Sequence, residues 1–125
     1  MQYMEISNKS VQEVVDSIKA VATKYKFGVL HVHNITQTLK SKGIEFEKEC
    51  QILDICNPLI ANKFLSEDMS LSIIMPCKIS VYSENGETIV AMNSLVQLVD
   101  DINPDLIELA QEVQEQLLEI IDEVK

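Results

Sequence analysis

The sequence contains no arginine, so its ten basic residues are all lysines. Arginine is the side chain whose planar fork matches phosphate groups and guanine edges. The chain is also acidic, with a formal net charge of −10 at pH 7. An acidic chain without arginine is poorly suited to nucleic acid or to an anionic lipid surface, so we expect neither as a partner.

Glycine and cysteine are scarce, with three residues of each. The glycines are widely scattered, which excludes a phosphate-binding loop, a dinucleotide-binding turn and a glycine-flanked serine elbow. No apolar run approaches the ~20 residues that span a bilayer. The N-terminal segment MQYMEISNKS lacks the basic and apolar regions of a secretory signal. An odd number of cysteines at low density favours free thiols, so we expect a cytoplasmic protein.

The acidity is concentrated in the last 26 residues, which carry a net charge of −8, whereas the preceding 99 carry only −2. This segment also predicts a long amphipathic helix over residues 104–124, with Asn103 as its cap and Pro104 at its first position. Apolar residues recur along it with the spacing 4-3-4-3-4, namely Leu106, Ala110, Val113, Leu117, Ile120 and Val124. We expect this seam to pack on the chain's own sheet, because two identical acidic helices side by side would repel each other.

The length of 125 residues indicates a single domain, residues 1–125, with enough apolar sequence (46%) for a core. Hydrophobic periodicity predicts helices at 10–25, 34–42, 57–65 and 95–99, in addition to the C-terminal helix. Strands are expected at 2–6, 29–34, 46–56, 71–83 and 88–92, with a break at Pro76 and a hairpin at Asn85-Gly86. Helices alternate with strands early and a hairpin comes late. This order predicts an α+β fold with a mixed or antiparallel sheet and helices packed on it.

Several local signals fix the predicted helix ends. Ser10 and Glu13 have the spacing of a capping box, and Asn57 followed by Pro58 begins a helix. Gly28 is expected to end the first helix in a left-handed conformation.

Two histidines, His31 and His33, lie in the alternating segment VLHVHN. Strict alternation places both on one face of a strand together with Val29, and places Leu30 and Val32 on the other face. With a cysteine from a neighbouring strand they could bind a metal. The alternative, which we favour, is a pair of ordinary histidines on a partly exposed face, because no third ligand is fixed by spacing.

Cys56 and Cys77 each lie beside a proline, Pro58 and Pro76, at the end of an apolar segment. In one interpretation they form a thiol pair at one end of the sheet, where the helix beginning at Asn57 would stabilise a Cys56 thiolate. In the other they are small buried residues that serve packing alone. Their spacing is not that of CxxC, so the usual redox and zinc signatures are absent.

Three segments, KFGVLHVHNITQTLKSKG, ILDICNPLIANKFL and IIMPCKISVYSENGETIVAM, occur in an order that resembles the bacterial and archaeal family known as domain of unknown function 302. The resemblance covers roughly residues 5–120. It implies a small α+β fold, often dimeric, with no established reaction and no assigned catalytic residue. Two departures are visible. Lys26 stands where the family's first glycine is expected, and Leu53-Asp54-Ile55 precedes Cys56 where smaller residues are expected.

These observations lead to a hypothesis of a non-enzymatic binding or regulatory module. We expect a homodimer, because short strands leave sheet edges and apolar surface to cover and because the resemblance implies one. A small ligand would bind near Cys56, Asn57, Cys77 and His31, and the sequence identifies no cofactor. The alternatives are a thiol-dependent enzyme or sulfur and redox carrier that uses Cys56, and a structural partner that acts through the acidic helix.

Overall fold

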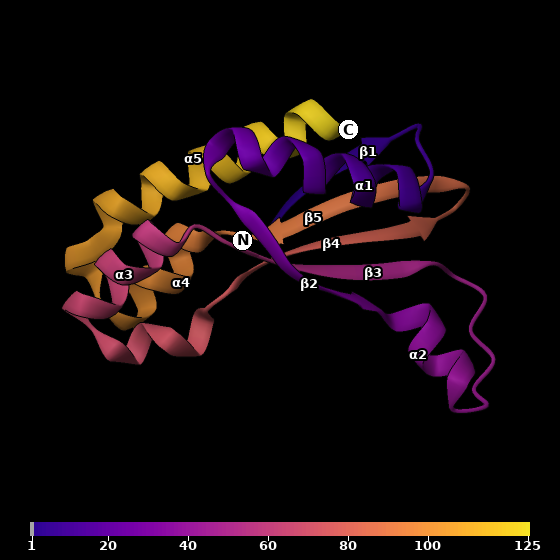
Figure 1. Cartoon of the computed structure of the whole chain (residues 1–125), viewed down its shortest axis with the longest axis horizontal. Coiled ribbons are helices and arrows are strands. Elements are labelled where there is room, and N and C mark those ends of the chain that lie inside the picture. The colour runs from indigo at the N-terminus through magenta and orange to yellow at the C-terminus, as the bar shows by residue number, and fades with distance from the viewer. Residues whose placement is uncertain (1) are drawn as a thin grey trace.

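The computed structural model describes residues 2–125, which form one five-stranded sheet with helices on one face and at both ends (Figure 1). The early elements are β1 (Gln2–Ser7), α1 (Val11–Ala22), the 3-10 helix η1 (Thr23–Tyr25), β2 (Gly28–Asn34) and α2 (Ile35–Ser41). The central elements are β3 (Cys50–Cys56), α3 (Pro58–Glu67), the 3-10 helix η2 (Met69–Ile74), β4 (Cys77–Glu84) and β5 (Glu87–Asn93). The chain ends with α4 (Leu95–Ile102), the 3-10 helix η3 (Pro104–Leu106) and α5 (Ile107–Val124).

The strand order is β1-β5-β4-β3-β2, and every neighbouring pair is antiparallel. The predicted α+β class with a sheet, packed helices and a long C-terminal helix is therefore confirmed. The sheet is the antiparallel alternative. Its turn between β4 and β5 has Asn85 and Gly86 at φ 51° and 79°, the left-handed values that suit Asn-Gly in a tight hairpin.

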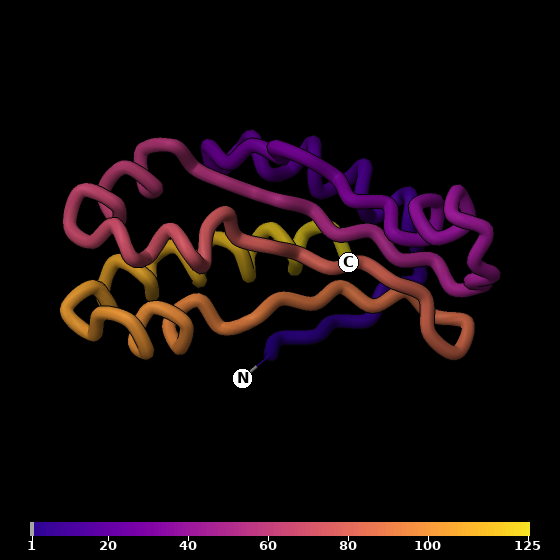
Figure 2. Tube along the Cα trace, turned by 90° about the horizontal axis from the view of Figure 1, so that it is seen from below, coloured from indigo at the N-terminus to yellow at the C-terminus, as the bar shows by residue number. Residues whose placement is uncertain are grey.

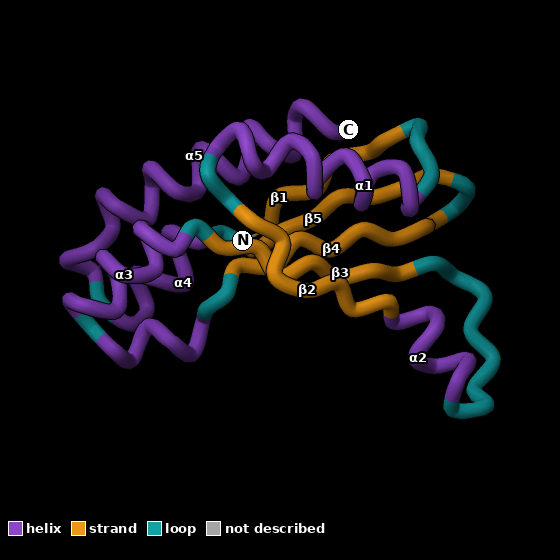
Figure 3. The backbone as a smooth tube through the Cα atoms, in the orientation of Figure 1, coloured by secondary structure: helices purple, strands orange, loops and turns teal. Residues whose placement is uncertain are grey.

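Helices α1 and α5 lie side by side over one face of the sheet (Figures 1 and 3). The apolar seam predicted for the C-terminal helix is buried there within the chain itself, through Ala110, Val113, Leu117, Ile120, Ile121 and Val124. At about 25 cal/mol per Å² of apolar area, burial of this seam contributes several kcal/mol, more than the helix gains from its own propensity.

The opposite face of the sheet has no helix across it in residues 2–125. Seen from below, the strands are in front and α5 lies behind them (Figure 2). Helix α2 lies at one end of this open face, and α3, η2 and α4 lie at the other. The sheet thus has a helical side and an open side.

Helix boundaries follow the local signals closely. Ser10 Oγ accepts a hydrogen bond from Glu13 N at 3.1 Å, and Glu13 Oε1 accepts one from Ser10 N at 3.1 Å. The left-handed residue after the first helix, however, is Lys26 at φ 65°, and Gly28 begins β2. The expectation for Gly28 was therefore wrong. The chain adopts at Lys26 the conformation that glycine would adopt most easily.

Two strand predictions also fail. A bulge between Val29 and His31 shifts the register of β2, so that Val29 and Val32 pair with inward residues of β3 and Leu30 is 63% exposed. One extra residue inverts the alternation on one side of the bulge. His31 and His33 still share a face.

Residues 69–74 form the 3-10 helix η2, whereas a strand was expected across Pro76. Asp68 caps η2, since its side chain accepts a 2.9 Å hydrogen bond from Ser70 N. Strand β4 begins only at Cys77, after a cis Met75–Pro76 peptide bond.

Candidate functional site

Cys56 and Cys77 lie at the same end of the sheet. Cys56 is the last residue of β3, and Cys77 is the first residue of β4 and pairs with Ile55. The chain leaves β3 through Asn57 into α3 and returns through η2 to Cys77. The corner therefore lies where the sheet meets the helices α3 and α4 (Figure 3).

A small pocket of about 30 Å³ lies at this corner, and Cys56, Asn57 and Cys77 all contribute to its lining. Its other lining residues are apolar: Phe27, Ile55, Ile60, Ala61, Phe64, Met75, Pro76, Leu95 and Val113. The Asn57 side chain is occupied as a helix cap. Its Oδ1 accepts hydrogen bonds from Leu59 N at 3.1 Å and Ile60 N at 3.5 Å.

A larger pocket of about 180 Å³ adjoins the small one and shares Met75, Pro76, Cys77 and Leu95 with it. The remaining lining residues come from η2, the adjoining strand ends and two helices: Ile73, Ile74, Lys78, Met92, Asn93, Leu98 and Leu117. Lys78 and Asn93 carry the only polar side chains of this lining apart from the Cys77 thiol. Most side chains that line the pocket are thus apolar, and each of two neighbouring strands adds one polar side chain.

Both thiols at the corner are held in their neutral form. Burial raises the pKa of Cys77 to about 11, and the nearby Cys56 raises it further. Burial also raises the pKa of Cys56. This direction is opposite to the thiolate stabilisation expected for a cysteine just before a helix, because burial removes water from around the sulfur and disfavours its charged form.

The structure separates His31 from this corner. His31 is exposed on the open face of the sheet opposite Asp54, and it lines neither pocket. Its ring meets that of His33 edge to face, with 4.4 Å between centroids. In residues 2–125, no group of three His, Cys, Asp or Glu side chains is arranged to hold a metal ion.

A polar cluster that the sequence did not predict surrounds Asp54. Its Oδ1 accepts a 2.6 Å hydrogen bond from Lys78 Nζ, and its Oδ2 lies 2.8 Å from Nε2 of His33. Lys78 first, and then His33, hold the pKa of the Asp54 carboxyl below its usual value. Lys78 therefore links this cluster to the larger pocket, which it also lines.

The alternating positions of Asp54 and Lys78 in their strands were the available signal for this cluster. Both residues are charged and occupy outward positions that alternate with buried apolar residues of their strands. Their pairing depends on the register of β3 with β4, which sequence spacing alone did not provide.

The comparison with known proteins agrees with the fold. The family described as Domain of unknown function DUF302 matches residues 3–124. The chain belongs to this family. A solved structure of an uncharacterized conserved DUF302 protein from Bacillus stearothermophilus is 30% identical, and it superimposes with a TM-score of 0.94 over 99% of this chain and 98% of that one. No curated protein matches the chain.

Membership of the DUF302 family confirms the resemblance drawn from the three sequence segments and the fold that it implied. It assigns no reaction. No helix in residues 2–125 combines the length and apolar character needed to cross a membrane.

Proposed function

We propose that this DUF302 protein is a single-domain, non-enzymatic module that binds a small molecule in the pocket beside Cys77. It works as a homodimer in the cytoplasm, where its three thiols stay reduced. The observation that supports this function is the pocket of about 180 Å³, whose apolar lining carries Lys78 and Asn93. An apolar concavity with a few polar groups is the usual form of a small-molecule site.

The dimensions of the pocket favour a compact ligand. A cavity of about 150 Å³ in another protein accepts benzene, so a pocket of about 180 Å³ suits a ring or branched chain of similar size. Lys78 Nζ donates one hydrogen bond to Asp54, and an ammonium group has three donors. The ligand class is therefore a small apolar molecule with one carboxylate or other acceptor that reaches Lys78 or Asn93.

In this proposal the Cys77 thiol is part of the apolar wall of the ligand pocket, and Cys56 lines the small pocket beside it. With a pKa of about 11, the Cys77 thiol carries almost no charge at pH 7, and the pKa of Cys56 is raised as well. A neutral, buried thiol packs as a small polarisable apolar group. A catalytic or sulfur-carrying cysteine needs a lowered pKa, so the raised values argue against the alternative in which Cys56 acts as a nucleophile.

Benzoate and toluene are suitable probes for a ¹H–¹⁵N NMR titration. We expect both to shift resonances around the pocket, and benzoate to bind more tightly because its carboxylate reaches Lys78. Leu98→Trp should fill the pocket and abolish binding of both. Leu59→Trp, a matched change at a residue 67% exposed on α3 and outside both pockets, should leave binding intact.

Two outcomes contradict the proposal. Absence of binding by either probe at millimolar concentration, with the spectrum of a folded protein, removes the pocket as a site. Unchanged binding by Leu98→Trp places the probes elsewhere on the molecule.

A further inference from the structure

The open face of the sheet carries an apolar band where a solvent-facing side usually carries polar residues. When one face of an antiparallel sheet packs on the core, the other normally alternates to polar side chains. Here Ile6, Ile89, Tyr82 and Cys50 pair in register across β1, β5, β4 and β3. They form one continuous row of outward side chains.

A second outward row lies beside the first and consists of Met4, Ala91, Ser80 and Ile52, paired across the same four strands. Met4 and Ile6, which begin these rows on the edge strand β1, are 54% and 55% exposed. Single exposed apolar residues are ordinary, but a contiguous patch marks an interaction site.

The two ends of this band differ in charge. Lys78 lies beyond the second row, with His31 and the Asp54 carboxylate. Beyond the first row, Glu84 and Glu87 pair directly across the hairpin. Like charges directly opposite each other are destabilising, and neither glutamate has an ion-pair partner within residues 2–125.

We propose that a second copy of this chain packs on the open face, related by a two-fold axis that runs across the strands between the two apolar rows. The proposal rests on the homodimer of the proposed function and assigns its interface. The axis passes the level of Val81, midway between Lys78 and Glu84 on β4. It therefore brings Lys78 of each copy over Glu84 of the other.

The same operation matches side-chain sizes. On β4 and β5 it places Tyr82 over the partner's Ser80 and Ile89 over the partner's Ala91, so a large residue faces a small one. On the two flanking strands the facing pairs are Ile6 with Met4 and Cys50 with Ile52. A two-fold axis along the strands would instead bring the glutamate pairs of the two copies together. Charge and size thus both favour the axis across the strands, in the aligned sheet packing that face-to-face sheets adopt.

The area of the face also suits a dimer. Five strands spaced about 4.8 Å apart, each about seven residues long at about 3.4 Å per residue, project to roughly 600 Å². The solvent-accessible surface of the face is larger than this flat projection, because the side chains make it uneven. A standard interface buries about 800 Å² of accessible surface per partner, which is comparable. In this arrangement the acidic α5 helices lie on the outer sides of the dimer, where their charges are far apart (Figure 1).

Light scattering at micromolar concentration should give twice the 14.1 kDa mass of the chain. Ile89→Lys should give a folded monomer, because it places a charge in the centre of the band. Leu59→Lys is the control. It introduces the same charge at an exposed apolar residue on α3, away from the band, and should leave the dimer intact.

A charge exchange tests the orientation independently of any effect on folding. Lys78→Glu and Glu84→Lys should each raise the dimer dissociation constant about tenfold or more, and the double variant should restore it. Lys78→Glu also removes the ion pair with Asp54, but the double variant lacks that ion pair too. Restored dimerisation in the double variant therefore reports the contact between residues 78 and 84 of the two copies.

These experiments distinguish failure of the homodimer from failure of the interface. A wild-type monomer at every concentration overturns both the dimer and this interface, while the ligand pocket is tested separately. A dimer that persists in Ile89→Lys, or a double variant no better than the single ones, overturns only the interface proposed here.

Discussion

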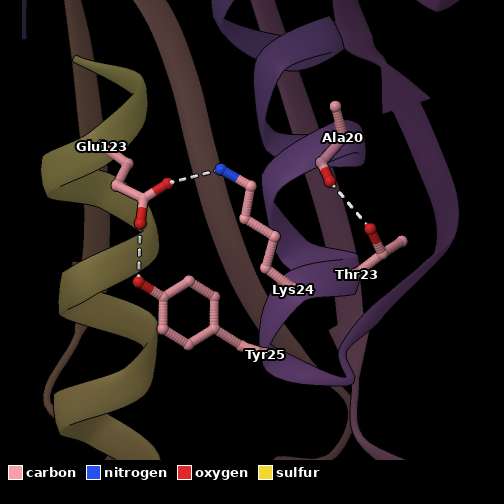
Figure 4. Close-up of polar contacts among 5 residues, drawn as sticks. All are labelled: Ala20, Thr23, Lys24, Tyr25 and Glu123. Carbon is pink, nitrogen blue, oxygen red and sulfur yellow. Dashed lines mark hydrogen bonds and ion pairs between the residues drawn. The ribbon is translucent and has the colours of Figure 1, made fainter.

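The hydroxyl of Tyr25 donates a 2.7 Å hydrogen bond to Oε1 of Glu123, and this bond joins the end of η1 to the last turn of α5 (Figure 4). Lys24 Nζ lies 3.4 Å from Oε2 of the same carboxylate. The Thr23 hydroxyl donates a 2.8 Å hydrogen bond to the Ala20 carbonyl and so holds the turn before them (Figure 4). Residues 98 positions apart thus fasten the C-terminal helix beside α1.

The first prediction concerns titration of this contact. Its hydrogen bond to Glu123 raises the pKa of Tyr25 from 10.0 to about 12 and, in turn, lowers the pKa of Glu123. The stabilisation from Tyr25 is therefore fully present below pH 10 and is lost as the pH rises through about 12. The stabilisation of the fold by the Glu123 carboxylate is present above the usual pKa of a carboxyl, and it is lost as the pH falls through the lowered pKa of Glu123. Absorbance at 295 nm should show one of the three tyrosines titrating near pH 12.

Glu123→Gln is the matched variant, because it keeps the shape of the side chain and removes its charge. It should return the late tyrosine toward pH 10. A titration curve unchanged by Glu123→Gln would show that the contact with Glu123 is not the cause of the late titration.

The parts of this fold that the sequence predicted are those fixed by neighbouring residues. Ser10, Asn57 and Ser94 each accept a hydrogen bond from a backbone N–H two or three residues on, so their helix starts depend on local sequence alone. The seam of the C-terminal helix was visible for the same reason. The pairing of β1 with β5 joins segments about 85 residues apart, and local patterns do not determine it.

The predictions that were wrong or missing concern features that depend on contacts between distant parts of the chain. The segment Met69–Ile74, with apolar residues between two serines, fits a strand as well as a helical turn, and only the Asp68 cap favours the 3-10 helix η2. The bulge after Val29 depends on pairing with β3. The corner residues Cys56, Asn57 and Cys77 were predicted because they end adjacent segments. The larger pocket was not, because Leu98 and Leu117 reach it from helices whose positions depend on the whole fold.

The second prediction is that Lys26→Gly stabilises the protein. Lys26 adopts φ 65°, a left-handed conformation that costs a non-glycine residue about 1 kcal/mol relative to glycine. The side chain forms no hydrogen bond or ion pair in residues 2–125, so its loss should cost little. The greater freedom of glycine in the unfolded chain offsets part of this gain, so we expect the free energy of unfolding, measured by urea denaturation, to rise by about 0.5 kcal/mol.

Gly28→Ala is the comparison for that experiment. Gly28 does not have a positive φ, and a Cβ atom built there meets nothing within 4 Å. Alanine at this position should therefore cost no steric strain. If Lys26→Gly destabilised the protein, the left-handed conformation at residue 26 would not be a source of strain.

The third prediction concerns thiol reactivity. With its pKa raised from 9.0 to about 11, Cys77 should have a thiolate fraction at pH 7 roughly 100-fold below that of an unperturbed cysteine. Iodoacetamide should therefore modify Cys77 very slowly in a Cys50→Ser, Cys56→Ser variant, and the rate should rise steeply with pH. Cys56, measured in the matching Cys50→Ser, Cys77→Ser variant, should react faster than Cys77 but more slowly than a free thiol. Rapid modification of Cys56 at pH 7 would revive the thiol-enzyme alternative.

The fourth prediction concerns the seam of α5. Val113 is 1% exposed and lies in the core, so Val113→Asp places an unpaired carboxylate among apolar residues. A buried uncompensated charge costs on the order of 3–5 kcal/mol, which is a large share of a small domain's stability. We expect loss of the near-UV circular dichroism signal. Gln111→Asp introduces the same charge at an exposed position of the same helix and should change the free energy of unfolding by less than about 0.5 kcal/mol. A Val113→Asp protein that stays folded and only loses its dimeric mass would make α5 an interface element, and the open face of the sheet would then need another explanation for its apolar band.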